Sequence, residues 1–275
     1  MTGTYLRSWL FVPATRPERF AKAAASGADA LIVDLEDAVA PQDKASARKI
    51  VMTQWPGGEG VTKVALRINP LDTRFGLEDL AALLASDVDP DFVLLPKCDS
   101  AEHLRLLDRL LASACKQARL VALVESAAGL AAADDIAGAT PRLAAAMLGA
   151  ADLGSDLGAV VAWEPLFYAR GRLIAACALA GILPIDAPFF DIKDEAGLAQ
   201  EAGRAVAMGY AAKAAIHPDQ IAPINAALTP EPAAVDEARL ILAEAAKGIG
   251  VVNGKMVDEA MARKARRILM MAGEE

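Results

Sequence analysis

The sequence has few residues of the kinds that build a zinc site or a disulfide framework. It contains two histidines and three cysteines, Cys98, Cys115 and Cys177, and no Cys-x-x-Cys pair. Cysteines so far apart support neither a zinc site nor a set of disulfides, so we expect reduced thiols. A metal bound by this chain would therefore be held by oxygen atoms, the ligands that Mg²⁺ prefers.

Long apolar runs and clustered positive charge are also missing. No apolar run reaches the roughly 18 residues that a membrane span needs. No basic region and cleavage site follow Met1, so we expect no signal peptide. The 28 basic and 36 acidic residues give a formal charge of −8, whereas non-specific nucleic-acid binding depends on clustered Lys and Arg. We expect a cytoplasmic protein that binds neither membranes nor nucleic acids.

Motifs of three common enzyme classes are absent from the sequence. There is no Gly-x-Ser-x-Gly elbow, no Gly-x-x-x-x-Gly-Lys-Ser/Thr loop, and no Gly-x-Gly-x-x-Gly after the first predicted strand. These absences argue against a serine hydrolase. They also argue against P-loop phosphoryl transfer and a Rossmann-type sheet.

The main pattern in the chain is an alternation of short apolar runs with longer segments of helical period. Predicted strands cover 9–14, 30–36, 63–69, 92–97, 120–126, 143–150, 183–190 and 211–217. Predicted helices follow at 17–26, 42–54, 76–86, 101–118, 128–137, 165–181, 194–208 and 218–227. Eight strand–helix units with continuously apolar strands predict an α/β fold of the (β/α)8 TIM barrel type.

The last part of the chain exceeds what closure of a barrel requires. After a break at 229–232, the pattern predicts a helix over 233–247, a Gly- and Asn-rich turn over 248–254 and a final helix over 258–272. We therefore divide the chain into a catalytic barrel at 1–228 and a C-terminal helical extension at 229–275. We expect the extension to cap the barrel or contact a neighbouring subunit.

Charged and polar residues follow the predicted strands, at the end of a barrel where chemistry collects. They are Asp34, Glu36, Asp37, Arg67, Asn69, Lys97, Glu125, Asp152 and His217. Glu125 and Asp152 follow neighbouring strands, so their carboxylates could converge on one Mg²⁺ or pair with nearby cations instead. Lys97 could alternatively form the Schiff base of a class I aldolase. We expect His217 to anchor the start of the following helix.

Several motifs match one known family in order along the chain. They are Arg7-Ser-Trp-Leu-Phe-Val-Pro, Arg16-Pro-Glu-Arg-Phe-Ala-Lys22, Val33-Asp-Leu-Glu-Asp-Ala-Val-Ala-Pro41, Leu66-Arg-Ile-Asn69, Leu95-Pro-Lys97, Val124-Glu-Ser126, Gly149-Ala-Ala-Asp-Leu153, Ile216-His-Pro-Asp-Gln-Ile221 and Gly254-Lys-Met-Val-Asp258. Through them the chain resembles the citrate lyase beta-subunit-like proteins, relatives of malyl-CoA and citramalyl-CoA lyases. The Val-Asp-Leu-Glu-Asp-Ala-Val segment with the downstream Glu and Asp carries most of the specificity.

The resemblance implies a (β/α)8 barrel that binds Mg²⁺ and a CoA-thioester substrate and assembles as a homotrimer or hexamer. It implies that Glu125 and Asp152 bind the metal and that Glu36 contacts metal-bound water. Arg67 would bind the carboxylate and carbonyl oxygen of a 2-keto acid.

The resemblance also assigns residues to the coenzyme and to proton transfer. Arg16 and Lys22 would bind the CoA phosphates. Asp258 would be the acid–base group, delivered into the site of a neighbouring subunit, although its position alone predicts a helix N-cap. Two departures from the family pattern, Ala14 in place of a glycine and Ala151 in place of an acid, remove none of the predicted site residues.

The sequence therefore predicts a Mg²⁺-dependent carbon–carbon lyase. It would cleave citramalyl-CoA, malyl-CoA or citryl-CoA to a 2-keto acid and an acyl-CoA by a reverse Claisen reaction. One alternative is a thioesterase that releases free acid and CoA from such an ester. Another is a carrier-dependent subunit of a citrate lyase complex, which the Arg16 and Lys22 pair disfavours.

Overall fold

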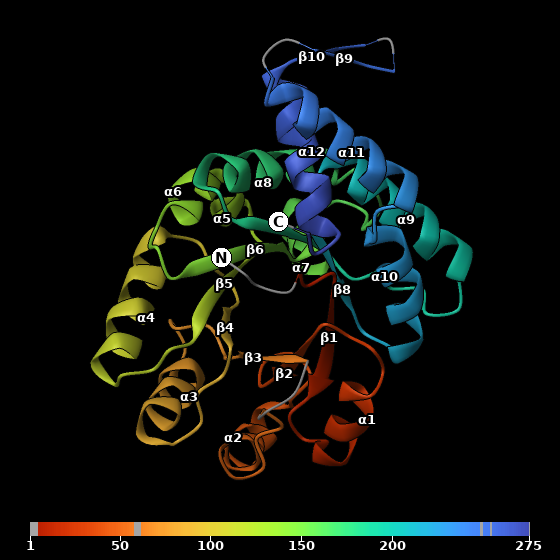
Figure 1. Cartoon of the computed structure of the whole chain (residues 1–275). Coiled ribbons are helices and arrows are strands. Elements are labelled where there is room, and N and C mark those ends of the chain that lie inside the picture. The colour runs from red at the N-terminus through yellow and green to blue at the C-terminus, as the bar shows by residue number, and fades with distance from the viewer. Residues whose placement is uncertain (1–4, 58–61, 248–249, 254, 275) are drawn as a thin grey trace.

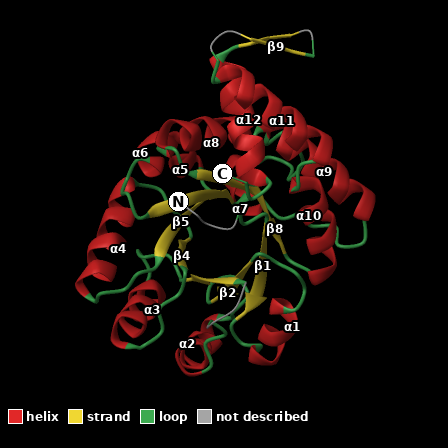
Figure 2. Cartoon of the chain, in the orientation of Figure 1, coloured by secondary structure: helices red, strands yellow, loops and turns green. Residues whose placement is uncertain are grey.

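Eight short apolar segments form a closed parallel barrel in the computed structural model, which describes residues 5–57, 62–247, 250–253 and 255–274 (Figures 1 and 2). The strands are β1 (Ser8–Pro13), β2 (Ala30–Asp34), β3 (Lys63–Arg67), β4 (Phe92–Leu95), β5 (Arg119–Val124), β6 (Leu143–Leu148), β7 (Leu183–Asp186) and β8 (Ala212–Ala215). Each strand pairs with the next, and β8 closes against β1 with Trp9 opposite Ala214. The predicted (β/α)8 fold is confirmed.

The strands are apolar throughout because both faces of the barrel wall are covered. Successive side chains of a strand point to opposite faces. On β2, Ile32 packs inside the barrel with Trp9 and Met147. Its neighbour Leu31 belongs to the larger cluster between strands and helices. Burial on both faces explains why no polar alternation marks the strands in the sequence.

Helices surround the barrel and follow the strands along the chain (Figure 2). They are α1 (Phe20–Ala24), α2 (Lys44–Thr53), α3 (Arg74–Ala85), α4 (Ala101–Ser113), α5 (Ala127–Ala131), α6 (Ala133–Ala137), α7 (Ala150–Leu157), α8 (Phe167–Ala180), α9 (Glu195–Met208) and α10 (Ile221–Leu228). Short 3₁₀ helices at Pro17–Arg19, Pro41–Asp43 and Pro218–Gln220 precede α1, α2 and α10. In each of them proline stands in the first turn, where its missing N–H is not needed.

Several predicted boundaries were wrong. The predicted strands run past the barrel, as at 183–190, because the residues after Asp186 leave the ladder for the active-site loops. Helix α7 was missed, since the apolar run of β6 continues into it; it ends at Gly158, which adopts a left-handed conformation (φ 63°). The predicted helix over 101–118 stops at Ser113, before the left-handed Cys115 (φ 57°).

The C-terminal segment contains α11 (Pro232–Ala245), the short strands β9 (Gly250–Val252) and β10 (Lys255–Val257), and α12 (Glu259–Met271). The two helices pack together and the hairpin of β9 and β10 projects from them (Figure 1). Part of the predicted turn over 248–254 is thus strand, while residues 248, 249 and 254 lie outside the described residues. The division of the chain at residue 228 stays a prediction.

Membrane-spanning helices are absent from the part of the chain that the structure describes. None of the described helices is both long and apolar enough to cross a membrane.

Candidate active site

Arg67 is the central cation at the carboxyl end of the barrel. It ends β3 directly opposite Asp34, the last residue of β2. Its Nε and Nη2 atoms donate to the two Asp34 oxygens at 2.7 and 2.6 Å. The guanidinium also lies 4.8 Å from the centre of the Phe11 ring. This bidentate pair and the ring fix the orientation of the guanidinium plane.

Arg67 is 7% exposed and stays charged. Burial alone would lower its pKa, but Asp34 and Glu36 outweigh burial and raise the pKa of the guanidinium. An arginine in this state stabilises negative charge on oxygen and does not exchange protons.

Asp34 also explains the spacing of the Val-Asp-Leu-Glu-Asp-Ala-Val segment. Its Oδ1 accepts a hydrogen bond from the Glu36 backbone N–H at 2.8 Å, and its Oδ2 accepts one from Ala38 at 3.2 Å. An aspartate that binds backbone groups two to four residues ahead folds its own loop. The same carboxylate therefore orients Arg67 and places Glu36 beside it.

Glu36 is a buried acid with an available oxygen. Its Oε2 lies 2.7 Å from Arg67 Nη1, yet no described residue donates a properly aligned hydrogen bond to that oxygen. Burial raises the pKa of Glu36 to about 8, against the lowering effect of Arg67, and Glu125 adds to the rise. This oxygen is buried and Glu36 does not line the pocket described below, so its contact with metal-bound water stays a prediction.

Lys44 supports this loop and was missed in the sequence. Its ammonium is buried and donates to the carbonyl oxygens of Leu35 and Glu36 at 2.8 and 2.6 Å and to Asn69 Oδ1 at 2.7 Å. Asn69, which the sequence placed among the strand-end site residues, is itself held by Asp79. Both side chains hold the backbone of the loop and do not line the pocket. A lysine in a predicted helix gives no sign of such burial.

Glu125 and Asp152 meet at the ammonium of Lys97. The backbone N–H of Lys97 donates to Glu125 Oε1 at 2.8 Å, and Lys97 Nζ lies 3.4 Å from the same oxygen. Lys97 Nζ also contacts Asp152 Oδ2. The carboxylates raise the pKa of Lys97 although burial opposes them. A Schiff-base lysine needs a neutral amine, so these contacts disfavour the class I aldolase alternative.

Two local features place the carboxylate pair. Glu125 follows β5 and is 4% exposed, and burial raises its pKa to about 7. Gly149 passes so close that a Cβ atom there would lie 2.4 Å from the Glu125 Cβ, so this position requires glycine. The sequence suggested that Asp152 ends a strand. It lies instead in the first turn of α7. The missed helix is what turns Asp152 back toward Glu125.

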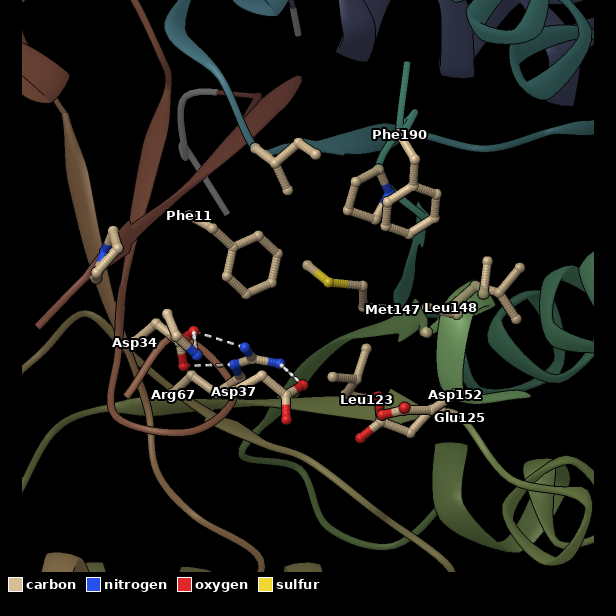
Figure 3. Close-up of a pocket in the computed structure, with 17 residues that line it drawn as sticks. Phe11, Asp34, Asp37, Arg67, Leu123, Glu125, Met147, Leu148, Asp152 and Phe190 are labelled. Carbon is tan, nitrogen blue, oxygen red and sulfur yellow. Dashed lines mark hydrogen bonds and ion pairs between the residues drawn. The ribbon is translucent and has the colours of Figure 1, made fainter. Parts of the chain in front are cut away.

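A pocket of about 400 Å³ joins these groups. Figure 3 shows Arg67 with Asp34 and Asp37 at one end, Glu125 and Asp152 at the other, and apolar side chains above them. The apolar wall contains Phe11, Leu123, Met147, Leu148, Pro188, Phe190 and Ile216. Among the described residues that line the pocket, Arg67 is the only cation. Four acids against one arginine leave the lining net negative, so an anionic substrate would need a bound cation as well as Arg67.

The donor set fits Mg²⁺ and does not fit a softer metal. Glu125 and Asp152 oxygens already surround one positive charge, that of Lys97. No group of three or more His, Cys, Asp or Glu side chains with metal-site geometry exists in the described parts of the chain. Mg²⁺ commonly takes one or two carboxylates and completes its octahedron with water and substrate oxygens.

The remaining predicted residues lie outside the pocket of their own chain. Arg16 and Lys22 follow β1 and are exposed, and Arg16 Nη1 lies 3.7 Å from Glu18 Oε1. Asp258 is the N-cap of α12 and accepts the Met261 N–H at 2.8 Å. The start of α12 adjoins the hairpin, away from the barrel strands (Figure 1). The structure thus places Arg67, Glu125 and Asp152 in one pocket and Glu36 beside Arg67, and it leaves Arg16, Lys22 and Asp258 apart.

His217 plays the structural part expected of it. Its Nδ1 accepts the backbone N–H of Asp219 at 3.3 Å, and Gln220 reaches back to the His217 backbone to complete a capping box. The imidazole is thereby engaged at the start of the 3₁₀ helix.

The pocket lies at the carboxyl ends of the strands and holds Arg67, Glu125 and Asp152. This is where enzymes of the (β/α)8 barrel class have their active sites. Residues 7–218 match the profile of the HpcH/HpaI aldolase/citrate lyase family, and the chain belongs to this family. It is a carbon–carbon lyase, as its named relatives are. The resemblance stated from the motifs is confirmed.

Four relatives illustrate the similarity. The L-malyl-CoA/beta-methylmalyl-CoA lyase of Cereibacter sphaeroides is 38% identical and aligns over 97% of this chain and 94% of its own. Citrate lyase subunit beta of Escherichia coli is 35% identical and aligns over 97% of this chain and 93% of its own. Among solved structures, RipC from Yersinia pestis is 50% identical over 84% of this chain and 99% of its own, with a TM-score of 0.75. CitE from Mycobacterium tuberculosis, solved with magnesium, acetoacetate and coenzyme A, is 35% identical over 100% of both chains, with a TM-score of 0.83.

Proposed function

We propose that this chain is a Mg²⁺-dependent lyase that cleaves a β-hydroxyacyl-CoA thioester to a 2-keto acid and an acyl-CoA. The observation that carries the proposal is the convergence of Glu125 and Asp152 on one cation position in a pocket that also holds Arg67. The names of the relatives support it, because they include malyl-CoA lyases and a CitE complex with magnesium and coenzyme A. Magnesium bound there supplies a Lewis acid and a template for the substrate oxygens.

Arg67 would bind the hydroxyl oxygen that becomes the keto oxygen of the product, together with the adjacent carboxylate. Its guanidinium is oriented by Asp34 before any substrate arrives. A preoriented cation stabilises developing charge on oxygen without reorganisation at the moment of reaction. Glu36, with an available oxygen beside Arg67, would accept a hydrogen bond from the same reacting region.

The charge of the pocket favours substrates whose keto-acid fragment has one carboxylate. Arg67 is the only cation among the described lining residues, and the wall above it is apolar at Phe11, Met147 and Phe190. A second carboxylate, as in citryl-CoA, would face this wall or the acids and lose hydration without gaining a partner. We therefore expect malyl-CoA or citramalyl-CoA to be cleaved in preference to citryl-CoA.

Coenzyme A and the proton would be handled by residues outside the pocket. Arg16 and Lys22 lie exposed after β1 and would bind CoA phosphates. Asp258 would deliver the proton to the acyl-CoA fragment from a neighbouring subunit, since it does not line the pocket of its own chain. The active form would then be a homo-oligomer, a trimer or a hexamer.

Product analysis tests the reaction. The protein is incubated with Mg²⁺ and malyl-CoA, citramalyl-CoA or citryl-CoA, and the products are identified by mass. We expect a 2-keto acid and an acyl-CoA. Release of the free hydroxy acid with CoA would instead establish the thioesterase alternative. No turnover of any CoA ester, together with turnover of a carrier-bound thioester, would establish the carrier-dependent subunit.

Subunit mixing tests the origin of the acid–base group. Asp258→Asn and Glu125→Ala should each be inactive alone, because one lacks the proton donor and the other a metal ligand. Hybrids of the two should regain activity at sites that combine an intact barrel with an intact neighbouring extension. If hybrids form and remain inactive, Asp258 does not act in trans, and its N-cap role, worth about 1 kcal/mol, is sufficient to explain it.

A further inference from the structure

Lys97 stands where a metal held by Glu125 and Asp152 would stand. Its ammonium contacts Asp152 Oδ2 and lies 3.4 Å from Glu125 Oε1. Its backbone N–H donates to that same Glu125 oxygen at 2.8 Å. One residue therefore supplies both a positive charge and a backbone donor to the carboxylate pair.

The backbone at Lys97 is specialised for this contact. Lys97 has a φ of 48°, in the left-handed region that residues with a Cβ atom adopt at a cost in free energy. The turn after β4 directs the N–H and the side chain of Lys97 toward the same acid. Such a conformation persists where surrounding contacts hold it, and such residues concentrate at functional sites.

The ammonium and a divalent cation are mutually exclusive at this point. Both need the oxygens of Glu125 and Asp152, and two like charges a few ångströms apart in a half-buried site repel strongly. The side chain of Lys97 is 35% exposed, so it has room to swing toward solvent.

We propose that Lys97 is a tethered cation that neutralises the Glu125–Asp152 pair and must be displaced when Mg²⁺ binds, so that it sets the metal affinity of the site. The inference rests on the proposed metal ligands and is independent of the substrate. Lys97 keeps the two carboxylates converged before the metal arrives, at the expense of affinity, because Mg²⁺ must replace a bond that is already made. Removing the ammonium should tighten metal binding rather than weaken it.

Calorimetric titration with Mg²⁺, after treatment with EDTA and dialysis, tests this on wild type, Lys97→Met and Lys49→Met. Methionine keeps the unbranched chain of lysine and removes its charge; Lys49 is an exposed lysine of α2 that serves as the matched control. We expect the Kd of Lys97→Met to fall at least about tenfold, as one close charge pair allows, and that of Lys49→Met to stay within about twofold because an exposed charge is screened. Unchanged or weaker binding by Lys97→Met overturns the proposal, as does the absence of binding to all three proteins.

Thermal unfolding separates competition from a merely structural role. If Lys97 competes with the metal, its loss destabilises the protein in EDTA and is compensated in saturating Mg²⁺, so the rise of Tm on adding Mg²⁺ should be larger in Lys97→Met than in wild type. A structural role would lower Tm equally with and without Mg²⁺. Lys97→Gln repeats both measurements if the methionine variant does not fold. Tighter Mg²⁺ binding without any lyase product would sustain this proposal and refute the proposed reaction.

Discussion

Two clusters of largely buried charge beside the barrel strands use similar residues for different purposes. The Arg67 cluster consists of Asp34, Glu36, Asp37 and Arg67 and lies beside β2 and β3. Its arginine, Asp34 and Asp37 open onto the 400 Å³ pocket, and Glu36 retains an oxygen without an aligned donor. Arg67, Asp34 and Asp37 are therefore open to a substrate.

The Lys213 cluster consists of Arg170, Asp186, Glu201 and Lys213 and lies beside β7 and β8. Lys213 is 1% exposed and donates to Asp186 and Glu201 at 2.7 and 2.8 Å and to a backbone carbonyl at 2.7 Å. Arg170 borders a second cavity of about 340 Å³. Its Nε donates to Asp186 Oδ1 at 3.0 Å, and its guanidinium lies 4.4 Å from the centre of the Trp163 ring.

The clusters differ in which group keeps an unpaired atom: an acid in the Arg67 cluster, and only the arginine nitrogen Nη1 of Arg170 in the Lys213 cluster, among the described residues. The lysine ammonium of the Lys213 cluster uses all three donors inside the protein, so this cluster joins β7 and β8 to α8 and α9. The Arg67 cluster leaves an acid with a raised pKa beside a fixed cation at the edge of a cavity, an arrangement typical of catalytic sites. A buried charge at a strand end is thus no sign of function until its partners are known.

The largest expected effect is a loss of stability when the ammonium of Lys213 is removed. Lys213→Met leaves Glu201 without its cation and leaves Asp186 with Arg170 alone, at a place where Asp186 is fully buried. Breaking a buried pair in this way typically costs about 3–5 kcal/mol. Urea denaturation should show that loss of unfolding free energy. A loss below about 1 kcal/mol, the usual worth of an exposed ion pair, would mean that this cluster is not the structural one.

Substituting the arginine of the Arg67 cluster should instead act on turnover. Arg67→Lys loses the planar fork that Asp34 orients, and we expect kcat/KM to fall at least about 100-fold, the scale of one oxyanion contact. Arg170→Lys is the matched control, since it removes the same fork from the Lys213 cluster. It should lower stability and leave kcat/KM of the folded enzyme nearly unchanged. Equal kinetic losses in the two variants would remove the distinction between the clusters.

Cations on the exposed surface should affect binding more than chemistry. Replacing Arg16 and Lys22 together by alanine should raise KM for CoA esters about tenfold or more, as expected for the loss of two charge-assisted contacts, while kcat changes little. Pantetheine esters, which lack the phosphates, should show no such difference between wild type and variant. Wild-type enzyme that uses pantetheine and CoA esters equally well would contradict phosphate recognition.

A further effect concerns the pH dependence of stability. The pKa of Glu36 is raised by burial from 4.5 to about 8. Between these values the folded protein keeps a proton that the unfolded chain has lost, so Glu36 lowers stability as pH rises through this window. Glu36→Gln, measured in EDTA, should therefore lose less stability between pH 5 and 8 than wild type does. A residual slope from Glu125, whose pKa is raised to about 7, should remain. Parallel curves for the two proteins would place the Glu36 carboxylate in a well-solvated state.

The sequence was sufficient for the barrel and for most of the pocket. Eight apolar runs predicted the strands because both faces of the wall are buried, and strand-end charges pointed to Glu36, Arg67 and Glu125. Helix α7 was not predicted, since its first residues continue the apolar run of β6, and with it the setting of Asp152 was missed.

Contacts between distant segments were beyond the reach of sequence reasoning. Nothing in the sequence distinguishes Lys44, buried under the Glu36 loop, from an exposed helical lysine, or separates Asp186 from the acids that line the pocket. The apolar wall of Phe11, Met147 and Phe190 is assembled from three separate strand–helix units. Only the closed barrel brings those residues together.

Reversible metal removal tests the central claim, that an oxygen-held Mg²⁺ at Glu125 and Asp152 supports carbon–carbon cleavage. The measurement is the rate at which malyl-CoA or citramalyl-CoA is converted to keto acid, before chelation with EDTA, after it, and after Mg²⁺ is restored. We predict loss of turnover on chelation and full recovery on addition of Mg²⁺, with no adduct on Lys97 after borohydride treatment in the presence of the keto acid. Undiminished turnover after exhaustive chelation, with a borohydride-trapped adduct on Lys97, would contradict the account and establish the Schiff-base mechanism in its place.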